Sequence, residues 1–196
     1  MKYNMYALGI MVAIVSFLGF VVENVWLALT KGYINNRNMN APFLLGYGLL
    51  MVAFYFILGT PNQMTLPAGL QKKLRARGRY ILYFVCALFA VCVSEIVLGE
   101  LVEMLCGIEY WNYENLPLHI TKYTSIPTSM AFATIITFFM GVCFEPLMAL
   151  IMQMDMKWMK IISVVFMIVM GIDFVTSFRI MFKRKDYYLK WKILLR

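Results

Sequence analysis

Five long apolar runs restrict what this chain can fold into. They cover residues 5–29, 43–60, 80–106, 127–153 and 161–182, and each is close to or above the roughly 20 helical residues that cross the hydrocarbon core of a bilayer. Of the 196 residues, 62% are hydrophobic and 14% are charged, whereas soluble domains are about half apolar and about a quarter charged. Lipid offers no hydrogen bonds, so the backbone must bond to itself, which favours helices. The sequence therefore predicts an all-α, polytopic helical membrane protein with about five transmembrane helices.

The connections between these runs are short. They are an Asn-rich segment at 31–42, a basic one at 71–79, an aromatic and acidic loop at 107–126 and a brief turn before the last run. The first run is too long for the core of a signal peptide and has no small-residue cleavage pattern after it, so we expect it to be retained. We predict a single helical transmembrane domain over residues 1–182, followed by a basic interfacial tail over 183–196.

The net charge of +8 does not indicate a nucleic-acid partner. The basic residues lie at the ends of the apolar runs, where Lys and Arg control topology and meet anionic headgroups. The bilayer is therefore the expected partner, and we expect the plasma membrane of a prokaryote. Five spans place eight basic residues on one side and ten on the other, a near tie that leaves dual insertion and a homodimer open. The basic, aromatic tail favours a cytoplasmic C-terminus and an external N-terminus.

Acidic side chains interrupt the apolar runs at related depths. Glu23 in the first run and Glu95 and Glu103 in the third reach similar levels at about 1.5 Å per residue, and Tyr47 begins the second run from the same side. Small residues recur on the faces that carry these acids. An ionisable group in lipid costs about 2.5 to 3.5 kcal/mol, so these faces should look inward. We predict an intramembrane polar site of Glu23, Tyr47, Glu95, Glu103 and Asp173, with Arg37, Trp111 and Tyr113 as its supporting loop.

Two interpretations of these acids remain open from the residues alone. They line a pocket for a cation, a proton or a polar solute, or they lock helices together by pairing with Arg37, Lys31 or Tyr47. Asp173 is either a second polar site or a single acid bonded to the nearby hydroxyls of Thr176 and Ser177. Glu145 precedes Pro146, which favours a kinked helix end over a ligand.

An internal repeat is also suggested. An acid-bearing helix, a polar loop and a proline that opens the next helix occur as Glu23, "YINNRNMNAP" and Phe43 onward. The same order occurs as Glu95, "EYWNYENLPLHITKYTSIP" and Thr128 onward. This pattern predicts a parallel two-helix repeat, with a site at the repeat interface as in many transporters.

Four segments resemble a known family: "FLGFVVEN", "NRNMNAPFLLGYG", "SEIVLGELVEMLCGIEYWNYENLP" and "GIDFVTSF". Over residues 10–182 the chain is similar to the family called putative ABC-transporter type IV, or CmpB-like, and this resemblance implies a permease. The family's signature of tryptophan, acid and tyrosine reads Trp111, Asn112, Tyr113 here. The family pattern carries onto Glu23, Arg37, Pro42, Tyr47, Gly48, Glu95, Glu103, Trp111, Tyr113, Pro117 and Asp173.

The sequence lacks the motifs of several other functional classes. There is no GxxxxGK[ST] phosphate loop, so an ATPase would have to be a separate subunit. No HExxH or GxSxG occurs, and the four cysteines have no CxxC spacing, so we expect no metal site and no cofactor, and the sequence leans against an enzyme. The function expected is an integral membrane permease-like protein that moves or binds a small polar solute, cation or proton. The alternative is a non-transporting assembly or regulatory subunit whose buried acids lock helices together.

Overall fold

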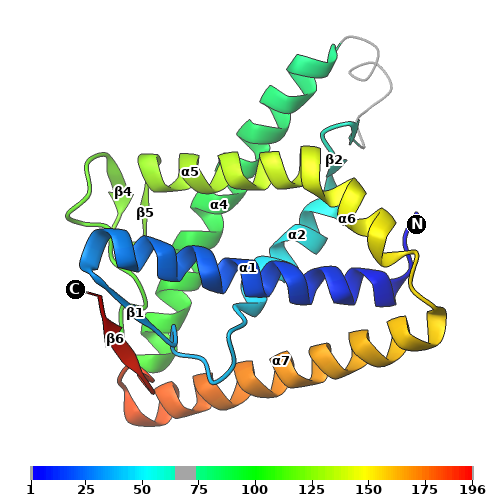
Figure 1. Cartoon of the computed structure of the whole chain (residues 1–196). Helices are drawn as coiled ribbons and strands as arrows, with labels where there is room; N and C mark the ends of the chain where they lie inside the picture. Colours follow the sequence, from blue (N-terminus) through cyan, green and yellow to red (C-terminus); the bar gives the residue numbers. More distant parts are fainter. Residues whose placement is uncertain (1, 65–73, 196) are drawn as a thin grey trace. The chain divides into compact units, whose positions relative to one another are not determined.

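The computed structural model describes residues 2–64 and 74–195, and these are mainly helical (Figure 1). Residues 71–73 of the basic connection and Arg196 of the tail lie outside the described residues. The helices are α1 (Met5–Lys31), α2 (Leu45–Ile57), α4 (Ala76–Cys106), α5 (Ile126–Phe138), the π-helix η1 (Phe139–Cys143), α6 (Phe144–Ile151) and α7 (Met156–Arg184). The short strands are β1 (Tyr33–Asn35), β2 (Gly59–Thr60), β3 (Gln63–Met64), β4 (His119–Thr121), β5 (Thr124–Ser125) and β6 (Lys192–Leu194). The all-α prediction is confirmed.

The chain divides into two compact units. One is Met1–Val52 with Leu147–Arg196, and the other is Ala53–Pro146. In the first unit α1 packs against α7, and in the second α4 packs against α5. Each unit therefore contains a long helix that carries an acid of the predicted site and a second apolar helix beside it.

Four helical segments of the described chain are long and apolar enough to cross a membrane. They are Met5–Lys31, Ala76–Cys106, Ile126–Ile151 and Met156–Arg184. α2, at the place of the second predicted span, has 13 residues, or about 20 Å at 1.5 Å per residue, against a hydrocarbon core of about 30 Å. It stops early because Gly59 adopts φ +74° and the tight β2–β3 hairpin follows. The polytopic helical architecture thus has four long apolar segments and one short helix.

Glycines end both helices that carry the candidate glutamates. Gly32 and Gly107 follow α1 and α4 in the left-handed conformation, with φ of 68° and 70°, and donate their N–H groups to Ala28 and Glu103. This conformation costs glycine nothing and satisfies a terminal carbonyl of each helix. As a result, each polar connection leaves its helix in a defined direction.

The predicted kink near Pro146 takes the form of a wide helical turn. Residues Phe139–Cys143 are π-helical, and α6 then carries Glu145 and Pro146 on to Ile151. Proline has no N–H to complete the α-helical ladder, and a π-turn is one way to accommodate such a break. Within the second unit the Tyr80 hydroxyl donates to the carbonyl of Gly141, at 3.0 Å, in this wide turn.

The basic tail is tied to the Asn-rich connection within the first unit. β6 pairs antiparallel with β1, with Ile34 opposite Ile193 (Figure 1). The side chain of Asn36 donates to the Tyr188 carbonyl at 2.9 Å and accepts from the Lys190 N–H at 3.0 Å. The tail therefore has a fixed place beside the segment that carries Arg37.

Candidate functional site

Glu23 joins two parts of the chain that follows α1. Its Oε2 lies 2.8 Å from Nη2 of Arg37, and its Oε1 accepts a 2.5 Å hydrogen bond from the Tyr47 hydroxyl. Arg37 belongs to the Asn-rich connection and Tyr47 to the first turn of α2. The side chains of Arg37 and Glu23 are only 16% and 22% exposed, so the ion pair is mostly shielded from solvent. Glu23 thus pairs with two of the three partners that the sequence offered for it, Arg37 and Tyr47.

The Asn-rich connection turns sharply at Arg37. Arg37 and Asn38 have φ of 47° and 61°, a left-handed conformation that asparagine tolerates better than most residues. The turn is held by the Met39 N–H, which donates to the Asn36 carbonyl at 2.9 Å, and by the Arg37 N–H, which donates to Asn35 Oδ1 at 2.9 Å. The asparagines of this segment thus shape the turn that brings the guanidinium to Glu23.

Asp173 in α7 is surrounded by donors from the same connection. Its Oδ1 accepts from the N–H and the Nδ2 of Asn40, at 2.8 and 2.9 Å, and its Oδ2 accepts from the Ala41 N–H at 3.0 Å. Ser177 also donates to Oδ1 at 3.1 Å, whereas the Thr176 hydroxyl bonds to backbone carbonyls. Asp173 is only 6% exposed. Of the two hydroxyls expected beside Asp173, one binds its carboxylate, and the connection supplies the other donors.

The second unit repeats the ion-pair arrangement at Glu103 in α4. Glu103 Oε1 lies 2.7 Å from Nζ of Lys122, and Oε2 accepts a 2.6 Å hydrogen bond from the Tyr123 hydroxyl. Lys122 also lies 3.0 Å from Glu109 Oε1. Sequence reasoning missed Lys122 and Tyr123. The signal that could have found them is a cation next to a tyrosine in the loop that returns toward an acid-bearing helix.

Glu95, two helical turns before Glu103, is bound by hydroxyl groups. Its Oε2 accepts from Thr124 Oγ1 at 2.7 Å and from Ser129 Oγ at 2.8 Å, and these two hydroxyls are 2.9 Å apart. Both Thr124 and Ser129 are fully buried. Thr124 directly follows Tyr123, so one short stretch of chain reaches both Glu103 and Glu95.

The two aromatic residues of the predicted supporting loop hold this stretch. Trp111 Nε1 donates to the Tyr123 carbonyl at 2.8 Å, and the Tyr113 N–H donates to the Lys122 carbonyl at 2.7 Å. Trp111 also makes an edge contact with the Tyr123 ring. Their role in the second unit is therefore to support the backbone of Lys122 and Tyr123.

The loop groups at this cluster have shifted proton affinities. Hydrogen bonds from Asn112 and Lys122 hold the pKa of Glu109 below its usual range. Hydrogen bonds to Glu103 and Glu109 raise the pKa of Lys122 above its usual range. Burial, and then the hydrogen bond to Glu103, raises the pKa of Tyr123 to about 12. At neutral pH Lys122 is thus a cation, Glu109 an anion and Tyr123 a neutral donor.

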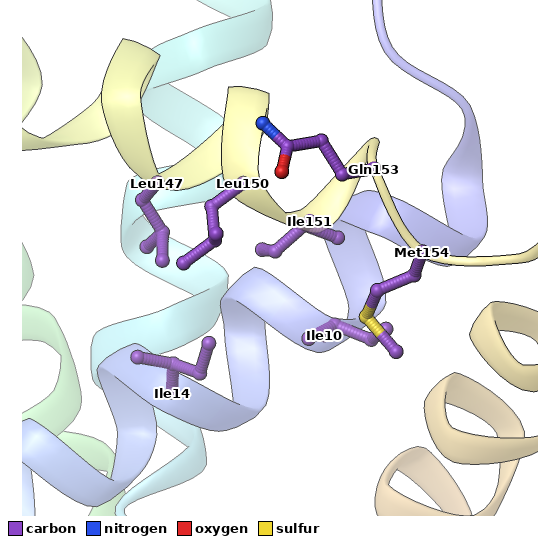
Figure 2. Close-up of a pocket in the computed structure, with 7 residues that line it drawn as sticks. All are labelled: Ile10, Ile14, Leu147, Leu150, Ile151, Gln153 and Met154. Carbon is purple, nitrogen blue, oxygen red and sulfur yellow. The ribbon is translucent and has the colours of Figure 1, made fainter.

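An apolar pocket of about 390 Å³ lies in the first unit, between α1, the end of α6 and the α6–α7 connection (Figure 2). Its seven lining residues include none of the predicted site residues and no charged side chain. They are Ile10, Ile14, Leu147, Leu150, Ile151, Gln153 and Met154. Its chemistry suits an apolar group, so it gives no support to a cation or proton site.

The predicted site residues fall into two sets. Glu23, Arg37, Tyr47 and Asp173 share the first unit, and Glu95, Glu103, Trp111 and Tyr113 share the second. That the two sets form one intramembrane polar site stays a prediction. Within the described residues there is no group of three or more His, Cys, Asp or Glu placed to hold a metal ion.

The predicted site residues and most of the helical residues fall within one family match. The family model described as "Putative ABC-transporter type IV" matches residues 10–178, which include every residue of the predicted site. No curated protein and no solved structure is significantly similar to the chain.

Proposed function

The chain belongs to the putative ABC-transporter type IV family, and from this premise we propose that it is a permease-like membrane component of a transport system. The observation that supports this proposal is the family match, which covers nearly all of the apolar helices. Since the sequence holds no phosphate loop, an ATP-driven system would need a separate ATPase subunit.

Within this proposal Glu95 is the acid best suited to bind and release a proton. Its hydroxyl partners, Thr124 and Ser129, can each donate to a carboxylate or accept from a protonated carboxyl. Both bonds can therefore persist through a change of protonation. Glu23 and Glu103 are paired with cations, so taking up a proton would cost each of them an ion pair.

Asp173 differs from Glu95 in the donors that surround it. Three of its bonds come from N–H groups of Asn40 and Ala41, which can only donate. These donors suit a permanent carboxylate. We therefore assign Asp173 to holding the Asn-rich connection and Glu95 to the exchange of a proton or a small cation.

The ion pairs support a second candidate function, a membrane assembly or regulatory subunit. Glu23 binds Arg37 at 2.8 Å and Glu103 binds Lys122 at 2.7 Å, each inside its own unit. Carboxylates used in this way join helices to loops without any solute. In this alternative Glu95 is one more such lock.

A flux measurement separates the two candidates. The purified protein is placed in liposomes that contain a pH-sensitive dye, and a proton gradient is imposed with the membrane potential clamped by potassium and valinomycin. We expect wild-type protein to dissipate the gradient and Glu95→Gln to slow this flux by about tenfold or more, because the amide cannot carry a proton. Glu100→Gln, the same change at an exposed position of α4, is the matched control and should behave like wild type.

The alternative predicts a different pair of results. Wild-type protein would give no flux above empty liposomes, and Glu95→Gln would lower the melting temperature in detergent. Flux that is equal in wild type and Glu95→Gln would remove Glu95 from the transport proposal.

A further inference from the structure

The two units contain the same short helical motif with the same tyrosine contact. α1 carries Gly-Phe-Val-Val-Glu at residues 19–23, and α4 carries Gly-Glu-Leu-Val-Glu at 99–103. In the first unit Tyr47 lies on Gly19 and its hydroxyl binds Glu23; in the second, Tyr123 lies on Gly99 and its hydroxyl binds Glu103. The glycine and the glutamate are one helical turn apart, so a single tyrosine reaches both.

The space at each glycine explains why no larger residue fits. A Cβ on Gly19 would lie 2.6 Å from Cγ of Tyr47, and a Cβ on Gly99 would come closer still to Cγ of Tyr123. Because Cγ lies on the χ2 axis, turning the ring about χ2 does not relieve this contact, and a change of χ1 would carry the hydroxyl away from the glutamate. Glycine in a helix is about 1 kcal/mol less favourable than alanine. These two glycines therefore lower the stability of their helices, but they allow the tyrosine ring to approach closely.

A basic side chain also binds each of these glutamates, and its position in the sequence relative to the tyrosine differs between the two units. Arg37 precedes Tyr47 by most of the Asn-rich connection, whereas Lys122 is the direct neighbour of Tyr123. Arg37 and Lys122 each bind one carboxylate oxygen of their glutamate, and the tyrosine hydroxyl donates to the other oxygen. Each carboxylate is thus shared between a cation and a phenol from the chain that follows its helix.

In each unit, the loop that these contacts hold also donates hydrogen bonds to a second acid. Arg37 and Tyr47 bind one carboxylate and close the loop between them, and within that loop Asn40 and Ala41 donate to Asp173. In the second unit Thr124 directly follows Tyr123 and donates to Glu95.

We propose that the protein uses one tyrosine latch twice, Gly19–Glu23–Tyr47 and Gly99–Glu103–Tyr123, and that each latch holds its loop where it serves a second acid. The latch of the second unit makes Tyr123 a positioning residue that holds Thr124 at Glu95. This consequence rests on the proposed function of Glu95, whereas the latches themselves do not.

Amide hydrogen exchange, measured by mass spectrometry on the full chain in detergent, tests the latches independently of transport. Gly99→Ala should speed exchange in residues 107–125 by about tenfold or more and leave 32–44 unchanged, because local opening exposes only the released loop. Gly19→Ala should do the reverse. Gly46→Ala and Gly171→Ala are matched controls, since a Cβ there meets nothing within 4 Å, and neither loop should change.

Phenylalanine variants keep the test valid if an alanine variant does not fold. Tyr47→Phe and Tyr123→Phe retain the ring and remove the hydroxyl that binds the glutamate, and each should speed exchange in its own loop. Unchanged loops in both, or equal acceleration of both loops by either one, would overturn the proposal.

The consequence for Glu95 needs a separate measurement. In the liposome assay Tyr123→Phe should shift the pH at which proton flux is half maximal, and Tyr47→Phe should not. A wild-type protein without flux would refute the proposed proton exchange at Glu95 and leave the hydrogen-exchange result to decide the latches. Flux with no pH shift in Tyr123→Phe would refute the positioning of Glu95 alone.

Discussion

At the scale of residues, the acids differ by the chemistry of their partners. Glu23 and Glu103 bind a cation and a phenol, Asp173 binds mostly N–H donors, and Glu95 binds hydroxyls. A charge in a membrane protein is tolerated when such groups replace the water it has lost. This difference between the partners is the basis of the proposal that Glu95 exchanges a proton, whereas Glu23, Glu103 and Asp173 hold the fold.

The raised pKa of Tyr123 gives a prediction about alkaline pH. Its folded pKa, about 12, exceeds the unfolded value of about 10, so the folded state binds the phenolic proton more tightly. The stabilisation from this proton is fully present below about pH 10 and is lost as the pH rises toward 12. The melting temperatures of wild type and Tyr123→Phe should therefore converge over this range. The difference between the tyrosinate absorbance titrations of wild type and Tyr123→Phe should show one tyrosine that ionises near pH 12; a difference that ionises near pH 10 would contradict the assignment.

At the scale of elements, the helices could be predicted more fully than the loops. Apolar length located α1, α4 and α7, and helical spacing placed Gly99 and Glu103 on one face. The partners Lys122 and Tyr123 could not be predicted, because they approach α4 only through the path of a loop that periodicity does not describe. The end of α2 depended on the left-handed conformation at Gly59, a local feature inside an apolar run.

Two glycines of the first unit should respond to alanine in opposite directions. Gly32 has φ +68°, where an added Cβ costs about 1 to 2 kcal/mol, so Gly32→Ala should lower the melting temperature. Gly171 lies inside α7, where an added Cβ would meet nothing within 4 Å, and Gly171→Ala should raise it slightly, since alanine favours the helix by about 1 kcal/mol. Thermal unfolding in detergent measures both. A strongly destabilised Gly171→Ala would indicate a neighbour packed on α7.

At the scale of the whole molecule, the first unit determines how its two long helices run through a bilayer. Asn4, just before α1, lies with its Nδ2 3.5 Å from Sδ of Met159 near the start of α7. At the other end, β1 follows α1 and pairs with β6, which follows α7. The two helices therefore run parallel. Since both are long and apolar enough to cross a membrane, we expect the N-terminus and the basic tail on opposite sides of it. The chain must then cross an odd number of times.

An odd number of crossings requires the region of the short α2 to complete a crossing, because the four long segments supply an even number. α2 covers about 20 Å of a hydrocarbon core of about 30 Å. Non-helical backbone is tolerated at membrane depth where protein buries it. The strand β2, which follows α2, is buried in the second unit. There the Tyr83 hydroxyl donates to the Gly59 carbonyl at 3.1 Å. A short helix followed by a buried strand thus supports the five crossings that apolar length predicts.

The composition of the tail then bears on which side is cytoplasmic. Its described part exposes basic and aromatic side chains together, namely Lys183, Arg184, Lys185, Lys190, Lys192, Tyr187 and Trp191. Such a surface suits the anionic cytoplasmic leaflet, where each basic residue near the surface contributes about 1 kcal/mol. We therefore expect the tail and the Asn-rich connection inside and the N-terminus outside, an orientation that places ten basic residues inside and eight outside.

Single cysteines in a cysteine-free background test this topology on intact cells with an impermeant thiol reagent. Lys2→Cys and Ala76→Cys should be labelled, and Tyr188→Cys should be protected until the cells are opened, because three crossings separate residue 76 from residue 188. Protection of Lys2→Cys together with Tyr188→Cys would show that the α2 region does not cross and that α1 and α7 cannot lie parallel in the membrane. Labelling of Tyr188→Cys alone would reverse the orientation. Partial labelling at all three positions would show insertion in both directions, the arrangement that an antiparallel homodimer requires and that a nearly even charge balance permits.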